Sequence, residues 1–333
     1  MRTIAHPLTE KEMPEMLTGV ITPMLTALNE DLTLDEDGNR SLIEWYKRTG
    51  AVTTIFVRSG TGQMFTYSYE EVETMIDLVL EEAKDDLYVM PGTSGTFPSG
   101  VREKRPNESK YIQESIELTR YAEKRGADGV VVLPLGLSPC RNMADKILDF
   151  YRKVDDAANI PIVIYQPPGV RPPFSMTPPL LHRLAELENL KGMKFSTSDM
   201  KDFGALCGAV IDQDFTMISG HEGAFLSSLV LGAGACIGGG CNTHPEVIRE
   251  IFDGFMEGDM MRAMRAQFKA IVLLSVRFGA SQYADVALNS SKMYLARKGV
   301  KVKPFNRGKS PISQAKMDEI EKAIDSAVSS VEP

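Results

Sequence analysis

Short apolar runs rich in β-branched residues alternate with longer amphipathic segments along most of the chain. Each short run predicts a strand that is buried on both faces, because such a strand is apolar at nearly every position. The predicted strands are 19–25, 53–59, 87–93, 129–135, 161–167, 190–196, 216–222 and 234–240. Their alternation with longer segments indicates a parallel sheet.

The longer segments predict helices, because their apolar residues recur every three or four positions and their other face is charged. These helices are predicted over 35–49, 69–84, 109–125, 142–158 and 178–187. Strands that alternate with helices form parallel sheets covered on both sides, and eight such units close into a barrel. We therefore predict an α/β protein with a (β/α)8 TIM barrel.

The pattern becomes purely helical after Pro245. Further helices are predicted over 245–256, 260–278, 287–298 and 312–328, with a basic stretch containing proline and glycine before the last. The domain organisation that follows is an N-terminal extension over 1–17, the barrel over 18–257 and a C-terminal helical extension over 258–333. We expect the last part to pack on the barrel.

Composition narrows the class of partner. The 333 residues carry a formal net charge of −8, which leaves no basic face for a nucleic acid. No apolar stretch reaches the length of a membrane span, and residues 1–16 are polar and mixed in charge, unlike a signal peptide. We expect a cytoplasmic protein that binds neither nucleic acid nor a membrane.

The cysteines and histidines do not predict a metal site. Cys140, Cys207, Cys236 and Cys241 form no C-x-x-C pair, and no histidine stands at metal-ligand spacing. We expect all four thiols to be buried and reduced.

Lys194 lies in the apolar run 190–196, where a strand would carry its amine into the interior. Burying an ammonium is costly, so burial favours the neutral amine, a nucleophile that attacks ketones and forms imines. The position of Lys194 therefore favours a Schiff-base enzyme. The alternative is that Lys194 snorkels to solvent from the strand end, as we expect Lys191 to do.

Other candidates also end predicted strands, because TIM-barrel active sites form at the carboxyl ends of the strands. Tyr165 ends the fifth strand, and the second leads into Ser59-Gly60-Thr61-Gly62-Gln63, whose glycines let backbone N–H groups converge on an anion. Alternatively, Tyr165 is a core tyrosine with a satisfied hydroxyl, and the glycines serve only the turn.

Taken together, these motifs resemble the dihydrodipicolinate synthase and N-acetylneuraminate lyase superfamily of class I, Schiff-base-forming aldolases. The resemblance covers nearly the whole chain, and the joint order of the motifs carries it. They are Gly19-Val20-Ile21-Thr22-Pro23, Gly60-Thr61-Gly62, Ile164-Tyr165, Gly192-Met193-Lys194, Ser219-Gly220 and Ile237-Gly238-Gly239-Gly240-Cys241-Asn242.

The resemblance implies a role for each matching residue. Lys194 would form an imine with a 2-oxo acid of the pyruvate type, and Tyr165 would move a proton to or from the substrate oxygen. Gly60 and Thr61 would hold the substrate carboxylate, and Arg171 would meet a second carboxylate. The resemblance implies no cofactor, neither a metal nor an organic group. It also implies a homotetramer, a dimer of dimers.

The last two predicted strands favour a polar, roomy substrate pocket. His221, Glu222, Ile237 and Gly238 are expected to bind the substrate, where they could face a hydroxylated chain. The alternative is that His221 and Glu222 pair with each other as scaffold.

The chain departs from dihydrodipicolinate synthases at three places. The relay tyrosine usual after the fourth strand is missing from Pro134-Leu135-Gly136-Leu137-Ser138, Gly60 replaces a relay threonine, and Gln63 replaces an acid. A phenol relay cannot run through leucine and glycine. The motif Gly60-Thr61-Gly62-Gln63-Met64-Phe65-Thr66 instead resembles the sugar-acid branch, the dehydratases and aldolases acting on 2-oxo-3-deoxy sugar acids, although that branch also usually carries an acid where Gln63 stands.

We therefore expect a lyase that makes or breaks a C–C or C–O bond next to a 2-oxo acid, as an aldolase or a dehydratase. One alternative is dihydrodipicolinate synthase itself, acting on pyruvate and aspartate semialdehyde. Another is a non-catalytic relative that binds a 2-oxo acid.

The loop 94–107 carries Arg102, Lys104 and Arg105. One hypothesis is that this loop folds over the site mouth or against a neighbouring subunit, where its charge would favour an acidic substrate. The alternative is a solvated surface loop.

Overall fold

All eight predicted barrel strands are present in the computed structural model, which describes residues 2–83, 85–98, 104–279, 284–308 and 313–329. They end within a few residues of the predicted bounds. The barrel strands are β3 (Gly19–Pro23), β4 (Thr54–Val57), β5 (Tyr88–Pro91), β6 (Val130–Val132), β7 (Ile162–Gln166), β8 (Leu190–Phe195), β9 (Thr216–Ser219) and β10 (Ala233–Cys236).

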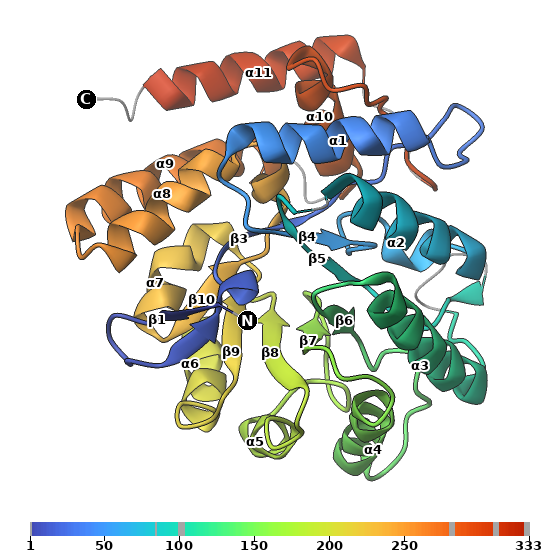
Figure 1. The fold of residues 1–333 in the computed structure, drawn as a ribbon. Helices are drawn as coiled ribbons and strands as arrows, with labels where there is room; N and C mark the ends of the chain where they lie inside the picture. Colours follow the sequence, from blue (N-terminus) through green and yellow to red (C-terminus); the bar gives the residue numbers. More distant parts are fainter. Residues whose placement is uncertain (1, 84, 99–103, 280–283, 309–312, 330–333) are drawn as a thin grey trace.

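These strands form one parallel sheet in the order β5-β4-β3-β10-β9-β8-β7-β6. A parallel bridge between Gly92 and Val131 joins the two ends of this sheet. The predicted (β/α)8 TIM barrel is therefore confirmed, and Figure 1 shows the helices arranged around it.

The covering helices match the predicted segments, with two additions. They are α1 (Glu36–Thr49), α2 (Tyr69–Ala83), α3 (Glu108–Arg125), α4 (Met143–Asp155), α5 (Pro178–Leu184), α6 (Met200–Ala209), α7 (Phe225–Val230) and α8 (Pro245–Met256). The pattern did not predict α6 and α7, because both are short and α6 contains two glycines. A signal for α6 was present, since the Asp199 carboxylate caps it by accepting from the backbone N–H groups of Lys201 and Asp202.

The core has two layers. One lies inside the barrel and includes Ile21, Phe56, Val163 and Tyr165, while the other lies between the barrel and its helices. This division follows from the alternation of side chains along each strand, which sends successive residues to opposite faces.

An N-terminal hairpin of β1 (Thr3–Ala5) and β2 (Glu12–Pro14) precedes the barrel and was not predicted. It leads into the single-turn helix η1 (Glu15–Leu17), whose Met16 and Leu17 join the inner layer of the core. The Thr54 hydroxyl donates to the Met16 carbonyl at 2.7 Å and ties this segment to β4.

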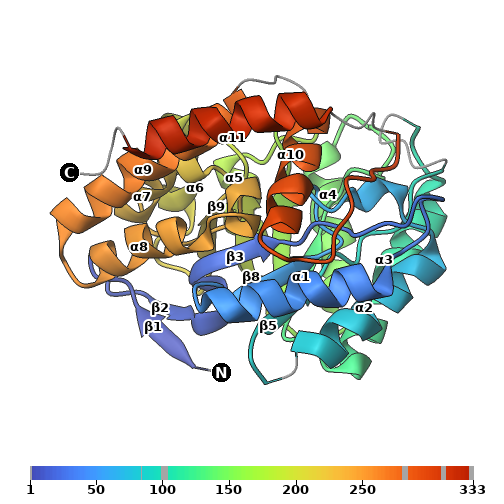
Figure 2. The same ribbon diagram turned by 90° about the horizontal axis from the view of Figure 1, so that it is seen from above.

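The C-terminal helices are α9 (Met260–Gly279), α10 (Ala284–Arg297) and α11 (Gln314–Ser329). They contact one another, α9 also contacts α8, and they form the orange-to-red side of the molecule in Figures 1 and 2. A helical C-terminal part is therefore present. The division of the chain at residues 17 and 257 stays a prediction.

The expectation that every cysteine is buried is wrong for Cys140, which is exposed because it lies in the loop between β6 and α4. Cys207, Cys236 and Cys241 are buried and free. Within the described ranges, no helix combines the length and apolar character that crossing a bilayer requires.

Candidate active site

Tyr165 and Lys194 are register partners on the adjacent parallel strands β7 and β8. Such partners share a face of the sheet, so both side chains point into the barrel. The Lys194 Nζ lies 4.2 Å from the centroid of the Tyr165 ring, and the residues are only 4% and 5% exposed. Lys194 therefore does not snorkel to bulk solvent.

Phe56 of β4 completes this arrangement. Its ring meets the Tyr165 ring edge-on, with centroids 5.9 Å apart, and lies 5.7 Å from the Lys194 Nζ. An edge-to-face pair of this kind limits rotation of both rings. The phenol is thus held against the amine by packing.

The amines of Lys194 and Lys191 differ sharply, although the two residues share β8. Lys191 is partly exposed and pairs with the Asp214 carboxylate at 2.6 Å. No carboxylate pairs with Lys194 among the residues that the structure describes. Lys194 is thus the buried amine that a Schiff-base mechanism needs, and Lys191 is an ordinary surface cation.

The turn after β4 lies next to the Tyr165 hydroxyl. A Cβ atom added to Gly60 would stand 2.9 Å from that oxygen, so the absence of a side chain at Gly60 makes room for the phenol. Hydrogen bonds hold the turn in place: Thr26 Oγ1 donates to the Gly62 carbonyl at 2.7 Å, and the Gly62 N–H donates to Ser59 Oγ at 3.0 Å. The turn and the lysine–tyrosine pair therefore belong to one site.

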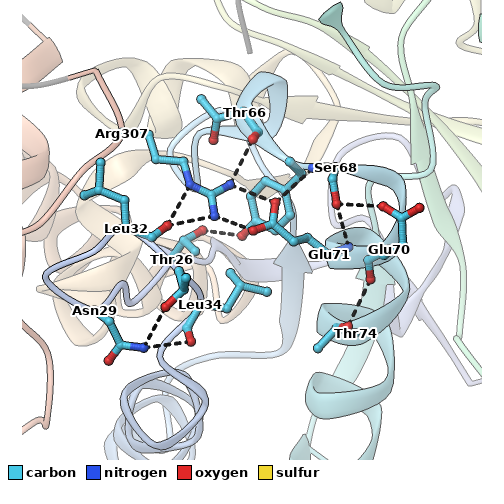
Figure 3. Close-up of polar contacts among 12 residues, drawn as sticks. Thr26, Asn29, Leu32, Leu34, Thr66, Ser68, Glu70, Glu71, Thr74 and Arg307 are labelled. Carbon is cyan, nitrogen blue, oxygen red and sulfur yellow. Dashed lines mark hydrogen bonds and ion pairs between the residues drawn. The ribbon is translucent and has the colours of Figure 1, made fainter. Parts of the chain in front are cut away.

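The C-terminal chain also reaches the region of this turn through Arg307, as Figure 3 shows. Its guanidinium donates to the carbonyls of Leu32 and Thr66 and forms a bidentate ion pair with the Glu71 carboxylate. Burial alone would raise the pKa of Glu71, but the bonds from Arg307 and from the Ser68 N–H together outweigh burial and leave that pKa lowered. Arg307 thus ties the chain after α10 to the start of α2.

A cavity of about 730 Å³ opens at this end of the barrel. Seven residues predicted for the site line it: Gly60, Thr61, Tyr165, Lys194, His221, Ile237 and Gly238. A larger hollow of about 940 Å³ lies at the amino ends of β4 and β5 and contains neither Lys194 nor Tyr165. The first cavity is therefore the candidate active site.

Glu222 is partly exposed and is not one of the residues that line the cavity. Its carboxylate accepts a hydrogen bond from the Gly240 N–H at 2.5 Å and packs so closely on Gly238 that a side chain there would overlap it. No hydrogen bond joins the side chains of His221 and Glu222 among the described contacts. Glu222 instead supports the backbone of the glycine run.

Arg171 is exposed and lines a separate hollow of about 230 Å³, together with Arg105. The structure therefore does not bring Arg171 together with Lys194. Arg105 donates to the Leu135 and Leu137 carbonyls and lies 4.5 Å over the Phe174 ring, so this end of the loop 94–107 packs on the protein. Lys104 is exposed, and Arg102 lies outside the described residues.

The Tyr111 ring occupies the space next to Gly136, in the segment where the sequence has no relay tyrosine. Gly136 lies so close to the Tyr111 ring that any side chain at position 136 would overlap it. Tyr111 is fully buried, its hydroxyl donates to the Leu133 carbonyl at 2.6 Å, and burial raises its pKa to about 12. Tyr111 therefore fills this space as a core residue.

Sequence reasoning missed a further set of lining residues. They are Met64, Phe65, Pro167, Pro168, Ser196, Thr197, Ser198, Gly220, Gly239, Ala287, Leu288 and Ser291. The run 196–198 directly follows β8, so the rule that sites form at strand ends could have found it. The last three belong to α10, and nothing in their local pattern indicates that they reach the barrel mouth.

Comparison with known sequences places the chain in a large group of relatives. An uncharacterised DapA-like lyase from Pyrococcus horikoshii is 29% identical over 295 residues, which cover 87% of this chain and 93% of the relative. A 4-hydroxy-tetrahydrodipicolinate synthase from Methanothrix thermoacetophila is 27% identical over 265 residues, covering 79% of this chain and 82% of the relative.

Solved structures share the fold. Dihydrodipicolinate synthase from Bacteroides thetaiotaomicron matches with a TM-score of 0.81 and 26% identity, over 94% of this chain and 100% of that one. YagE, a prophage protein from E. coli solved in complex with pyruvate, matches with a TM-score of 0.80 and 21% identity, over 93% and 98% of the chains. The model of the dihydrodipicolinate synthetase family matches residues 16–327, and the chain therefore belongs to that family.

Proposed function

We propose that this protein is a class I lyase that joins Lys194 to a 2-oxo acid as a Schiff base. One observation carries the proposal: a buried lysine amine, paired with no carboxylate of the described residues, lies 4.2 Å from a buried tyrosine ring in a cavity also lined by Gly60 and Thr61. Buried amines attack ketones, and a neighbouring phenol can move the protons that imine formation requires.

The proposed reaction begins when the Lys194 amine adds to C2 of the 2-oxo acid and water leaves. The protonated imine accepts electrons as C3 loses either a proton or a carbon partner, which gives an enamine. C3 then takes up a proton or attacks an aldehyde carbon, and hydrolysis releases the product and the free amine. In a dehydratase the enamine would instead expel a hydroxyl group from the neighbouring carbon.

Tyr165 and the turn after β4 have separate tasks in this scheme. The Tyr165 hydroxyl gives a proton to the departing water and recovers it during hydrolysis. The backbone N–H groups at Gly60 and Thr61 hold the substrate carboxylate, with the Thr61 hydroxyl assisting. Because Gly60 has no side chain, the phenol can lie beside this carboxylate site.

The proposal is tested by incubating the protein with pyruvate, reducing with borohydride and measuring intact mass and modified peptides. We expect one reduced pyruvate adduct, located on Lys194 and lost in Lys194→Arg. Lys191→Arg is the matched control, because Lys191 lies on the same strand but pairs with Asp214. Failure to trap any of several 2-oxo acids would favour a non-catalytic binding protein.

The synthase reaction is the second candidate, because curated relatives carry the name 4-hydroxy-tetrahydrodipicolinate synthase. It would need a proton route other than a tyrosine at position 136, where the Tyr111 ring leaves no room. Product analysis distinguishes the two candidate reactions. One assay uses pyruvate plus aspartate semialdehyde, and the other uses 3-deoxy-2-oxo sugar acids. Formation of the cyclic synthase product would favour the second candidate.

We also propose a cytoplasmic homotetramer. Exposed apolar side chains on α9 support a subunit contact there: Met261, Met264, Phe268 and Ile271 are 37% to 58% exposed. Light scattering measures the assembly, and a monomer over the micromolar range would contradict it. Cell fractionation tests the compartment.

A further inference from the structure

The candidate site has almost no charge beyond the imine-forming lysine. Lys194 is the only lysine, arginine, aspartate or glutamate among the described residues that line the cavity. His221, its one lining histidine, is exposed to solvent, which screens any charge on it. A 2-oxo acid brings one carboxylate, for which the Gly60–Thr61 turn supplies backbone N–H groups. The other described lining residues offer no comparable anion site.

Two buried cations near the cavity, Arg58 and Lys292, already donate hydrogen bonds to backbone carbonyls. Arg58 is 2% exposed, and its guanidinium donates to the carbonyls of Gly92, Ser94 and Gly95. Lys292 is 1% exposed and donates to the Phe305 carbonyl at 2.5 Å. Neither lines the cavity, so neither is placed to neutralise a second substrate carboxylate.

Three arginines near the surface either bond other groups or lie outside the cavity. The Arg307 guanidinium bonds the Glu71 carboxylate and two backbone carbonyls. Arg105 donates to Leu135 and Leu137, and Arg171 lines the separate hollow of about 230 Å³ beside it. Among the residues that the structure describes, no free cation therefore faces the cavity, and a second carboxylate there would lose hydration without gaining a counter-charge from them, which is strongly unfavourable.

The remaining lining is predominantly apolar. Met64 and Phe65 follow the turn after β4, Ile237 follows β10, and Leu288 comes from α10. Met64, Ile237 and Leu288 are each less than a tenth exposed, so these side chains form a packed wall. Hydroxyl groups are present at Ser196 to Ser198 and at Ser291, but they are neutral.

We propose that the second reactant, the aldehyde added to or released from the 2-oxo acid, is uncharged and carries an apolar chain. This inference rests on the proposed function. In the condensing direction, the enamine C3 forms a bond to the aldehyde carbon, and the aldehyde oxygen takes up a proton as its C=O double bond becomes a C–O single bond. Hydrolysis of the imine then gives a 4-hydroxy-2-oxo acid and frees Lys194. The chain of the aldehyde packs against Phe65 and Leu288.

The test compares aldehydes that differ in one property. Succinic semialdehyde and its methyl ester have the same reacting group and spacing, but only the first carries a carboxylate at neutral pH. Butanal and glyceraldehyde are both neutral, but only the second carries hydroxyl groups. Initial rates of condensation with pyruvate give kcat/KM for each, and mass spectrometry identifies the 4-hydroxy-2-oxo products.

We expect the ester to exceed the free acid by at least about tenfold in kcat/KM, and butanal to exceed glyceraldehyde. Leu288→Arg should reverse the first preference, because it adds a cation to the apolar wall. Leu288→Gln is the matched substitution, since it makes the same position polar without adding charge, and it should not reverse the preference. If Leu288→Arg does not fold, the kcat/KM values of the wild type for the ester and the free acid still test the proposal.

Faster condensation with succinic semialdehyde than with its ester would overturn the inference. So would a preference for glyceraldehyde over butanal, or a pyruvate adduct on Lys194 with no condensation of any neutral aldehyde. These results leave the Schiff-base proposal intact. Absence of the pyruvate adduct itself would overturn both.

Discussion

Gln63 and Arg307 exchange two hydrogen bonds, although 244 positions separate them. The Gln63 amide donates to the Arg307 carbonyl at 2.8 Å, and the Arg307 N–H donates to the Gln63 side-chain oxygen at 3.1 Å. Gln63 therefore docks the chain after α10 onto the turn that contains Gly60. A glutamine amide can both donate and accept in this way, whereas an ionised carboxylate could only accept.

Loss of the Arg307 side chain should loosen the segment whose backbone groups bond Gln63, because the guanidinium anchors that segment to Thr66 and Glu71. Arg307→Met leaves the Glu71 carboxylate without its guanidinium, which costs about 1–3 kcal/mol of stability for a partly buried charged bond. We expect KM for pyruvate to rise by about tenfold, with partial rescue by Arg307→Lys, while Lys194 is still trapped by borohydride.

The matched control for Arg307 is Arg297→Met. Arg297 also pairs with a carboxylate of the C-terminal part, Asp318, but that pair is exposed. Exposed pairs contribute about 0–1 kcal/mol, so this variant should keep both its melting temperature and its KM. Equal KM values for the two variants would show that Arg307 does not position the turn.

A methyl group at position 60 should displace the Tyr165 phenol. The Cβ of Gly60→Ala would lie 2.9 Å from the Tyr165 hydroxyl oxygen, and the ring cannot retreat freely because it packs edge-on against Phe56. We expect kcat/KM to fall by about 10²-fold, as is typical of a reacting group moved by about 1 Å.

Gly208→Ala provides the comparison for this substitution. Gly208 lies in α6, and a Cβ there meets nothing within 4 Å. This change should be neutral or slightly stabilising, because alanine favours a helix over glycine by about 1 kcal/mol. If Gly60→Ala kept wild-type kinetics beside this control, the proposed role of the Tyr165 hydroxyl next to Gly60 would be contradicted.

Lys292 should make stability depend on pH in the alkaline range. Burial lowers the pKa of Lys292 from 10.5 to about 7. Between these values the unfolded chain binds the proton and the folded chain does not, so stability rises with pH across this window. The destabilisation that comes from burying the Lys292 ammonium is complete below the pKa of the folded state, about 7. It disappears as the pH approaches the unfolded-state pKa of 10.5.

Thermal unfolding of the wild type and Lys292→Met measures this effect. The variant should exceed the wild type in melting temperature near neutral pH, and the difference should shrink towards about pH 9.5. Lys298→Met serves as the control, because Lys298 is exposed. A difference that stays constant with pH would show that Lys292 is not desolvated as described.

The barrel could be predicted from the sequence because its strands are apolar runs and most of its helices, α6 and α7 excepted, show one clear apolar face. The same logic found Tyr165 and Lys194, since both lie at strand ends where TIM barrels place their sites. Their mutual distance could not be predicted, because it depends on the register of β7 against β8.

Other features depend on contacts between distant segments. The approach of α10 to the cavity, and of Arg307 to Gln63, leaves no local signature in either segment. Arg171 was a candidate by its position after Tyr165, yet the loop carries it into a separate hollow. Sequence patterns report which face of an element is buried, and they do not report how loops fold back.

Exchange of the C3 protons of pyruvate with deuterium, followed by NMR, tests the central claim most directly. In the proposed mechanism, imine formation at Lys194 makes these protons acidic, and Tyr165 supplies the protons that imine formation needs. We predict rapid exchange in the wild type, none above background in Lys194→Ala, and a rate reduced by about 10²-fold in Tyr165→Phe. Exchange that persists undiminished in Lys194→Ala would contradict the account.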